Sequence, residues 1–191
     1  MALVAALAAD ASGAAHAQGR LDAEYVASIS GIPVGKGTWI VEISDTGYVS
    51  AASGATSGLL KAFTGAHGNG AAQGAVVGGQ PVPTSYSATI VDSRHVDEVH
   101  ISLTNGNVTN YSAEPPLLAL PDRIPLTDAD RHGVVDPMTS ALTRVGGSGD
   151  PVTPGACNRK VSVFDGRVRY DLHSQFLSLI HISEPTRQAE I

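Results

Sequence analysis

Apolar and polar residues alternate over much of the chain, and this alternation predicts β-strands. At residues 21–30 the apolar side chains occupy every second position, which is the period of a half-buried strand. The GIPVG sequence at 31–35 predicts a turn, and residues 38–44 alternate again as a second strand. The DTG sequence at 45–47 then predicts a hairpin into a third strand at 48–55. Strands that follow one another in this way are expected to pair as neighbours.

The same pattern returns in the middle of the chain. Strands are predicted at 85–91, 98–103 and 108–113. Asn105-Gly106, between the last two, is a strong hairpin signal because a type I′ turn needs a positive φ at both central residues.

Two intervening segments are less regular. Residues 57–63 fit either another strand or a short helix capped by Ser57, and the spacing of Leu59, Leu60 and Phe63 favours the helix. Residues 65–79 are rich in Gly and Ala but match no phosphate-binding pattern between a strand and a helix. We therefore expect a loop there, followed by a strand of small residues.

A second helix start is clearer. Asp136 is a good N-cap and Pro137 suits the first helical position, so the sequence predicts a helix at 137–144. Its core-facing side chains are expected to be Ala141, Leu142 and Val145.

A hairpin is predicted near the C-terminus. Residues 159–164 and 167–172 read as two strands joined by the turn Asp165-Gly166. We expect the second strand to lie at an exposed edge, because the strands that should pair with it are not in the chain.

These elements predict an all-β, mainly antiparallel fold: a curved sheet or open half-barrel with one or two short helices. Composition agrees, since 191 residues suit one domain, and Gly (21) and Pro (11) are common while aromatic residues make up 5%. The net charge of −6 argues against nucleic acid as a partner. No apolar run is long enough to predict a membrane span.

The two ends of the chain predict its location and its domain limits. Residues 1–17 resemble the end of a secretory signal peptide, with the A-x-A sequence AHA at 15–17, which predicts a periplasmic or secreted protein. This segment lacks a basic start and is interrupted by Asp10, so an Ala-rich N-terminus is the alternative. Residues 177–191 begin LSLIHISEPTR, which is the translation of a common sequencing adapter. We therefore expect one domain at 18–176 and no packed position for the residues that follow.

Candidate metal and catalytic motifs are weak. Asp128, Asp130, Gly133 and Asp136 mimic part of a calcium loop, but position five is a His and position twelve is Thr139 in place of the bidentate Glu. Solvated carboxylates and a helix cap explain the loop better. No zinc-binding pair occurs among the scattered histidines, which include His67, His95, His100, His132 and His173. Gly-x-Ser-x-Gly is also absent. The sequence predicts no catalytic residue, metal ligand or cofactor.

Two features near the C-terminus could still contact other molecules. Cys157 is the single cysteine, which in an exported protein indicates a missing disulfide partner or a free thiol. A local basic patch reads either as a solvated strand face or as a contact for anionic lipid headgroups or a cell-wall polymer. Its members are Arg159, Lys160, Arg167 and Arg169.

The order of elements resembles a family of exported proteins of Gram-negative bacteria, catalogued as domain of unknown function 3108. The resemblance covers about residues 21–172. It is carried by GIPVG at 31–35, residues 83–86, VVDPMTSAL at 134–142, Cys157, and VFDGRVRYDL at 163–172. It implies a β-rich envelope protein with a curved antiparallel sheet, and no reaction is assigned to the family.

Three functions follow as hypotheses. The first is a non-enzymatic exported protein whose concave apolar face holds a lipid or another hydrophobic ligand. The second is a structural or assembly factor that binds an envelope partner through a sheet edge or the basic hairpin. The third, a hydrolase, is disfavoured and would require a buried cluster of polar residues with perturbed pKa values. A closed, fully packed interior would contradict the first hypothesis.

Overall fold

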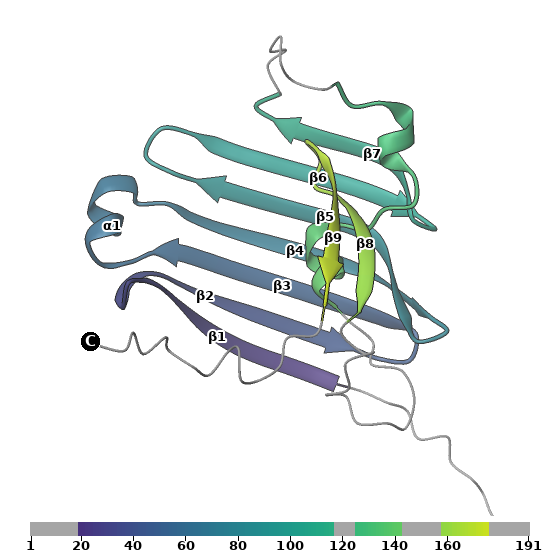
Figure 1. Ribbon diagram of the computed structural model, residues 1–191, viewed down its shortest axis with the longest axis horizontal. Helices are drawn as coiled ribbons and strands as arrows, with labels where there is room; N and C mark the ends of the chain where they lie inside the picture. Colours follow the sequence, from purple (N-terminus) through teal and green to yellow (C-terminus); the bar gives the residue numbers. More distant parts are fainter. Residues whose placement is uncertain (1–18, 117–124, 143–157, 176–191) are drawn as a thin grey trace, which may run out of the picture.

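One antiparallel sheet forms the body of the molecule. The computed structural model describes residues 19–116, 125–142 and 158–175. Its first seven strands follow chain order, each hydrogen-bonded to the next (Figure 1). They are β1 (Gly19–Ile29), β2 (Ile32–Ile43), β3 (Gly47–Thr56), β4 (His67–Val77), β5 (Gln80–Val91), β6 (Val96–Thr104) and β7 (Asn107–Glu114). The helix α1 (Gly58–Thr64) connects β3 to β4.

The C-terminal elements lie across one face of this sheet, which we call the inner face (Figure 1). The 3₁₀ helix η1 (Asp128–Arg131) and the short helix α2 (Pro137–Ala141) precede a hairpin of β8 (Arg159–Phe164) and β9 (Arg169–Ser174). Helix α2 contacts β4, β5 and β8. The inner face is therefore covered over part of its width.

The strand register shows which residues share the inner face. Val41 pairs with Ser50, Ser50 with Ala72, Ala72 with Tyr86, and Tyr86 with Ile101. Directly opposed residues lie on the same side of a sheet, so this row runs across β2–β6 under the C-terminal elements. Its members are buried, with Tyr86 partly so. The alternate residues, which include Glu42, Ala51 and Ala71, lie on the opposite, outer face.

The hydrophobic core lies between β6 and the hairpin. Phe164 of β8 is 0% exposed and packs edge-on against Tyr111, with ring centroids 5.4 Å apart and an interplanar angle of 89°. Val99, Ile101 and Leu103 of β6 and Val134 complete this cluster. Phe164 is thus the main contact by which the hairpin packs against the sheet.

Backbone hydrogen bonds attach the loop before α2 to both layers. Val134 N donates to the carbonyl of Gly106 at 2.9 Å, in the turn between β6 and β7. Val135 N donates to the carbonyl of Ser162 at 3.0 Å, and Phe164 N donates to the carbonyl of Val135 at 2.9 Å. Residues 134–135 therefore link the sheet to β8.

The predicted fold class is confirmed. The sheet is antiparallel throughout, and it is open because β1 and β7 each pair with a single neighbour among the described strands. The hairpin at Asn105-Gly106 is also confirmed, with φ of 49° and 76°. No helix in the described part of the chain is long and apolar enough to cross a membrane.

Two segments differ from the prediction in their limits. Residues 32–35 belong to β2, and the turn before them is Ser30-Gly31, where both φ values are positive (50° and 80°). The strand of small residues expected within 65–79 is β4, which begins already at His67, so the loop before it is shorter than expected. Pairing with β3 and β5 on its two sides outweighs the weak strand propensity of its glycines and alanines.

Burial of β1 and of α2 also differs from the prediction. Strand β1 is almost entirely exposed rather than half-buried, because α2 and the hairpin cover the other part of the inner face. Helix α2 ends at Ala141, since Leu142 already has an extended backbone, and Thr139 rather than Ala141 is its buried residue. The expected strand at 167–172 is β9, which pairs with β8 alone in the described structure. The expectations for residues 143–145 and for those after 176 lie outside the described residues.

We predict that Phe164→Ala will lower the free energy of unfolding by about 3–5 kcal/mol, because it removes a fully buried ring and leaves a cavity. Urea denaturation followed by circular dichroism measures this change. Val168→Ala in the same hairpin is the control, because Val168 is 47% exposed and its truncation should cost less than about 0.5 kcal/mol. Equal effects of the two changes would contradict the assignment of Phe164 to the core.

Candidate functional site

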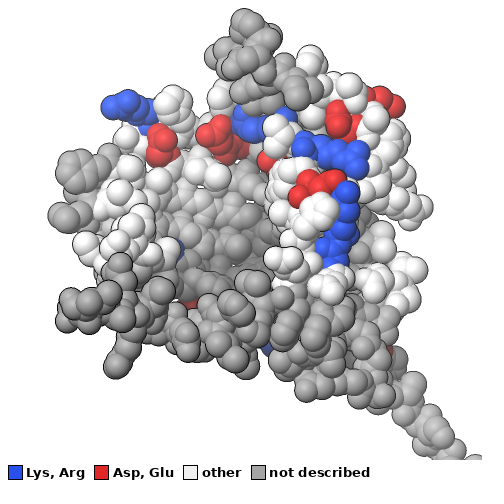
Figure 2. Space-filling view, in the orientation of Figure 1, with Lys and Arg blue, Asp and Glu red and all other residues white. Residues whose placement is uncertain are grey.

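An open apolar trough lies on the inner face, next to the part that α2 and the hairpin cover. Figure 2 shows this face hollowed beside the C-terminal hairpin. The hollow has a volume of about 530 Å³ and is bordered by residues of β1–β5 and by Met138 of α2. This volume is within the range of small-ligand pockets.

The floor of the trough is made of very small residues. In one row Gly37 pairs with Gly54, and Gly54 pairs with Gly68. In the next row Ala52 pairs with Gly70, and Gly70 pairs with Ala88. These side chains do not extend beyond Cβ, so the floor is flat on β3 and β4. The first row ends at Ile90 on β5, and the second row begins at Trp39 on β2.

Larger side chains form the walls. Tyr25 of β1 and Ile90 of β5 lie at opposite ends of the glycine row and are 52% and 56% exposed. Met138 closes the side next to α2, where its Sδ lies 3.4 Å from the position that a Cβ on Gly70 would take. Tyr86 also borders the trough.

Charged side chains do not project into the floor. Lys36, Ser53, His67 and Asn69 border the hollow, but they alternate with the floor residues along β2, β3 and β4. Their side chains therefore belong to the outer face. The floor and walls can accommodate an apolar molecule without burying an unpaired charge.

A buried polar network holds α2 on the sheet beside the trough. Asp136, at the N-cap of α2, accepts hydrogen bonds from the backbone N–H groups of Met138 (3.0 Å) and Thr139 (2.9 Å). The Thr139 hydroxyl donates to Asp136 Oδ2 at 2.5 Å and lies 2.5 Å from the Tyr48 hydroxyl of β3. Next to Tyr48 in β3, Ser50 accepts a hydrogen bond from Trp39 Nε1 at 2.7 Å. Helix α2 is thereby fixed to the sheet by side-chain hydrogen bonds.

Burial shifts the titration of this network. Removal from water raises the pKa of the Asp136 carboxyl, and the hydrogen bonds from Thr139 and Met138 lower it in part. Burial also raises the pKa of Tyr48 to about 12, against the opposing effect of the hydrogen bond with Thr139. The Tyr48 hydroxyl is therefore protonated at neutral pH.

The network resembles the buried polar cluster that the hydrolase hypothesis required. Its central groups are inaccessible, since Asp136 and Ser50 are both 0% exposed. The Asp136 carboxyl is already bonded to α2, and the Thr139 hydroxyl lies between it and Tyr48. In this arrangement the hydrogen bonds of the network position α2 on the sheet.

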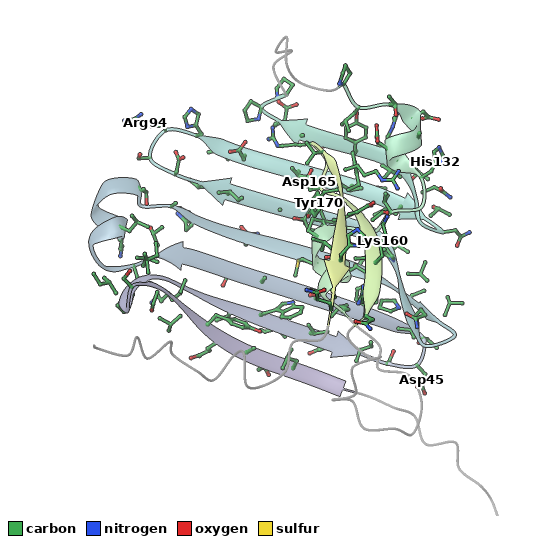
Figure 3. All side chains as sticks on the ribbon, viewed as in Figure 1. Asp45, Arg94, His132, Lys160, Asp165 and Tyr170 are labelled. Atoms are coloured by element: carbon green, nitrogen blue, oxygen red, sulfur yellow. The ribbon has the colours of Figure 1, made fainter. Side chains whose placement is uncertain are left out.

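The four basic residues of the predicted patch are bonded within the protein. Arg167 donates to Asp97 Oδ1 at 2.9 Å, and Arg159 donates to the carbonyls of Ser140 (3.1 Å) and Leu142 (3.2 Å). Lys160 forms an ion pair with Asp171 at 3.1 Å, and Arg169 donates to the carbonyl of Ala129 and to Ser162. Lys160 lies on the hairpin in front of the sheet (Figure 3). Contact of this patch with an anionic partner stays a prediction.

The turn of the hairpin has a tight geometry. Asp165 Oδ1 accepts hydrogen bonds from the N–H groups of Arg167 and Val168, both at 2.8 Å. Gly166 has a φ of 92°, and a Cβ there would lie 2.5 Å from Val99 Cγ1. A side chain at 166 is thus excluded by both the backbone and the core.

The calcium-like segment forms local contacts instead of a ligand set. Asp128 pairs with Arg131 at 3.1 Å, and Asp130 accepts from the N–H and hydroxyl of Thr127 at 2.8 and 2.7 Å. His132 Nδ1 lies 2.9 Å from Asn107 Oδ1. The described residues contain no group of three or more His, Cys, Asp or Glu placed to hold a metal ion. Cys157 lies outside the described residues.

The trough was not found from the sequence, although a signal was present. Gly37, Gly54, Gly68 and Gly70 stand inside strands, where glycine often marks the close approach of a ligand or another backbone. Two of them fell in the segment interpreted partly as a loop. Their alignment depends on strand register, which a single sequence does not give directly.

We predict that Asp136 makes stability depend on pH. The pKa of Asp136 is higher in the folded state than in the unfolded state. At a pH between these two pKa values, the folded state therefore binds more protons than the unfolded state. Its contribution to the free energy of unfolding should therefore rise as the pH falls through the folded pKa, and level off below the unfolded one.

Asp136→Asn keeps the size of the side chain and removes this titration. Urea denaturation at a series of values from roughly pH 7 to pH 4 should show wild type gaining stability relative to the variant as the pH falls. The other carboxyl groups are present in both proteins, so their effect on stability cancels in the difference between wild type and variant. A stability difference that is constant over this range would show that Asp136 does not titrate differently in the folded state.

Comparison with known proteins places the chain in a family. The family model described as "Protein of unknown function (DUF3108)" matches residues 24–178. A search of curated proteins and a search of solved structures each gave no match. Since the matched segment contains β1–β9 apart from the first residues of β1, the chain belongs to the DUF3108 family of proteins of unknown function.

Proposed function

We propose that this protein binds a lipid or another hydrophobic ligand in the trough on its inner face and catalyses no reaction. The observation that carries the proposal is the flat floor of Gly and Ala residues, open to solvent and free of charged side chains. The solvated face of an antiparallel sheet normally has polar side chains, and the floor of the trough has none.

Energetics support an apolar ligand. The exposed side chains of Tyr25 and Ile90 border the trough together with Met138, so a ligand lying there would remove apolar surface from water on both partners. Each Å² of such surface contributes roughly 25 cal/mol. Contiguous exposed apolar surface of this kind is typical of binding sites.

We also propose that the protein acts in the periplasm or outside the cell, which the signal-like segment at 1–17 supports. The alternative, an assembly factor that binds its partner through the basic hairpin, has less support. The cationic groups of Arg159, Lys160, Arg167 and Arg169 already bind acceptors within the protein. An envelope partner would have to compete with those contacts.

Filling the trough tests this proposal. Gly54→Leu places a side chain on the floor, and a Cβ there meets its nearest neighbour at 3.7 Å, so the fold should tolerate it. We expect the purified wild type to bind the fluorescent hydrophobic probe 1-anilinonaphthalene-8-sulfonate in the native state, and the variant to bind it at least tenfold more weakly.

Ala71→Leu on the outer face is the matched control, because Ala71 is the neighbour of Gly70 and exposed. Ala71→Leu adds the same side chain to β4, the neighbour of β3, and should leave probe binding unchanged. Equal binding by wild type and both variants would show that the probe does not occupy the trough. Native mass spectrometry of the wild type then reports any ligand that co-purifies.

A further inference from the structure

One end of the sheet exposes apolar side chains to solvent. This end, which we call the α1 end, consists of helix α1 and the turn between Ile29 and Ile32 (Figure 1). Ile29 and Ile32 are directly opposed in the strand register and are 65% and 62% exposed, and Leu60 of α1 is exposed as well. The N–H of Ser57 donates to the carbonyl of Val34 at 2.9 Å, which holds the start of α1 against β2. The exposed residues of the turn and of the helix therefore lie at the same end of the sheet.

The α1 end is basic although the protein is acidic. Lys36 of β2 and Lys61 of α1 are both exposed. The chain has a net charge of −6, yet residues 25–41 and 46–91 contain no Asp or Glu. Neither lysine forms an ion pair within the described part of the chain. The four basic residues of the hairpin, in contrast, bind acceptors within the protein.

The nearest carboxylates leave these two lysines unpaired. Glu24 of β1 lies two positions further from the turn than the residue that pairs with Lys36 in the strand register. Asp92, in the turn between β5 and β6, accepts hydrogen bonds from the backbone N–H groups of Arg94 and His95 at 2.7 and 2.8 Å. Arg94 lies at the same end of the sheet as α1 (Figure 3). The surplus of positive charge at this end is therefore available to an anionic partner.

The combination of residues indicates which partner fits. Lysine is depleted in interfaces between proteins, so a protein partner would leave Lys36 and Lys61 unexplained. Lysines beside exposed apolar residues, without nearby acids, are typical of segments that lie at a membrane surface. There the apolar side chains enter the acyl boundary, and the long lysine side chains reach the headgroup phosphates.

We propose that the α1 end binds the surface of an anionic lipid bilayer. Ile29, Ile32 and Leu60 insert at the acyl boundary, and Lys36 and Lys61 contact the phosphates. This inference goes beyond the proposed function, because the contact involves no ligand in the trough.

The position of the trough gives the contact a use. Ala27 and Gly35, which pair with each other in the register, border the trough and lie close to the turn of the α1 end. A protein bound through the α1 end therefore holds one end of the trough near the bilayer. This placement shortens the path that a hydrophobic ligand takes through water.

Co-sedimentation of the full chain with vesicles tests the apolar part of the contact. The vesicles are phosphatidylcholine with about 30% phosphatidylglycerol. We expect wild type to bind them, and the double variant Ile29→Thr with Ile32→Thr to bind roughly tenfold more weakly or worse. Threonine keeps the β-branched side chain that suits a strand. Val77→Thr is the control, because Val77 is 62% exposed and lies at the opposite end of β4 from α1, and it should bind as wild type does.

A second pair of substitutions tests the charges. Lys36→Gln with Lys61→Gln should weaken binding to the same vesicles roughly tenfold or more, since each lysine near an anionic surface contributes about fivefold in affinity. Binding to vesicles of phosphatidylcholine alone should not change. Added salt should weaken the binding of wild type to the anionic vesicles. Lys160→Gln is the control on the hairpin, because Lys160 is exposed but paired with Asp171, and it should have no effect.

Four results would overturn the proposal. Wild type that does not bind anionic vesicles would exclude the membrane contact. Equal binding by wild type and the isoleucine double variant would exclude insertion of the turn. Weakening by Lys160→Gln, without weakening by the Lys36 and Lys61 substitutions, would assign the contact to the hairpin. A wild-type dimer in analytical ultracentrifugation that the isoleucine double variant dissociates, without vesicle binding, would assign the α1 end to a second copy of the chain. Probe binding in the trough is measured without vesicles, so the two proposals are tested independently.

Discussion

The desolvated carboxylate of Asp136 is the constraint on which the inner face depends. A buried charge without a cation is costly, and no ion pair of Asp136 occurs among the described contacts. Two backbone N–H groups and the Thr139 hydroxyl offset this cost, and they do so only when α2 is helical and lies on β3. The position of α2 then fixes Met138 at the wall of the trough. The segment just before α2 includes Val134 and Val135, whose backbone hydrogen bonds join the sheet to β8.

In this sheet, the residues that stabilise the fold and the residues that border the trough lie in different places. Its ladder is continuous from β1 to β7, but large apolar side chains are concentrated under the hairpin, around Phe164 and β6. Next to the hairpin, the inner face of β3 and β4 has Gly and Ala instead. Backbone hydrogen bonding and the core on one side therefore maintain a surface on the other side that contributes little packing of its own.

Local rules predicted most of the fold. Period-two alternation located the strands, Asn105-Gly106 defined a hairpin through its positive φ requirement, and Asp136-Pro137 defined the start of α2. Burial was harder to predict, because it depends on which elements cover a strand. Leu21 and Tyr25 alternate like core residues, yet no described element covers them. Phe164 was not recognised because it and Val163 are adjacent and both buried, which a strand with one buried face does not allow.

The candidate site was less predictable than the fold for a related reason. Its floor exists because glycines and alanines of four strands are in register, and pairing across strands is not a property of any one segment. The family resemblance was recognised from five segments, among them the motif around Asp136 and the hairpin, which both serve the architecture. None of the five contains a floor residue, so recognising the family did not locate the trough.

The order of the strands has a consequence for how the chain folds. Each strand from β1 to β7 pairs with its successor, so the sheet can form through contacts that are short in sequence. The contact between Tyr48 and Thr139 spans 91 residues, and Phe164 meets β6 from later still. During synthesis the apolar side of the sheet emerges well before the segments that shield it. A nascent chain stopped before β8 would present that side to chaperones or to other unfolded chains, which makes the interval before β8 the period of greatest aggregation risk.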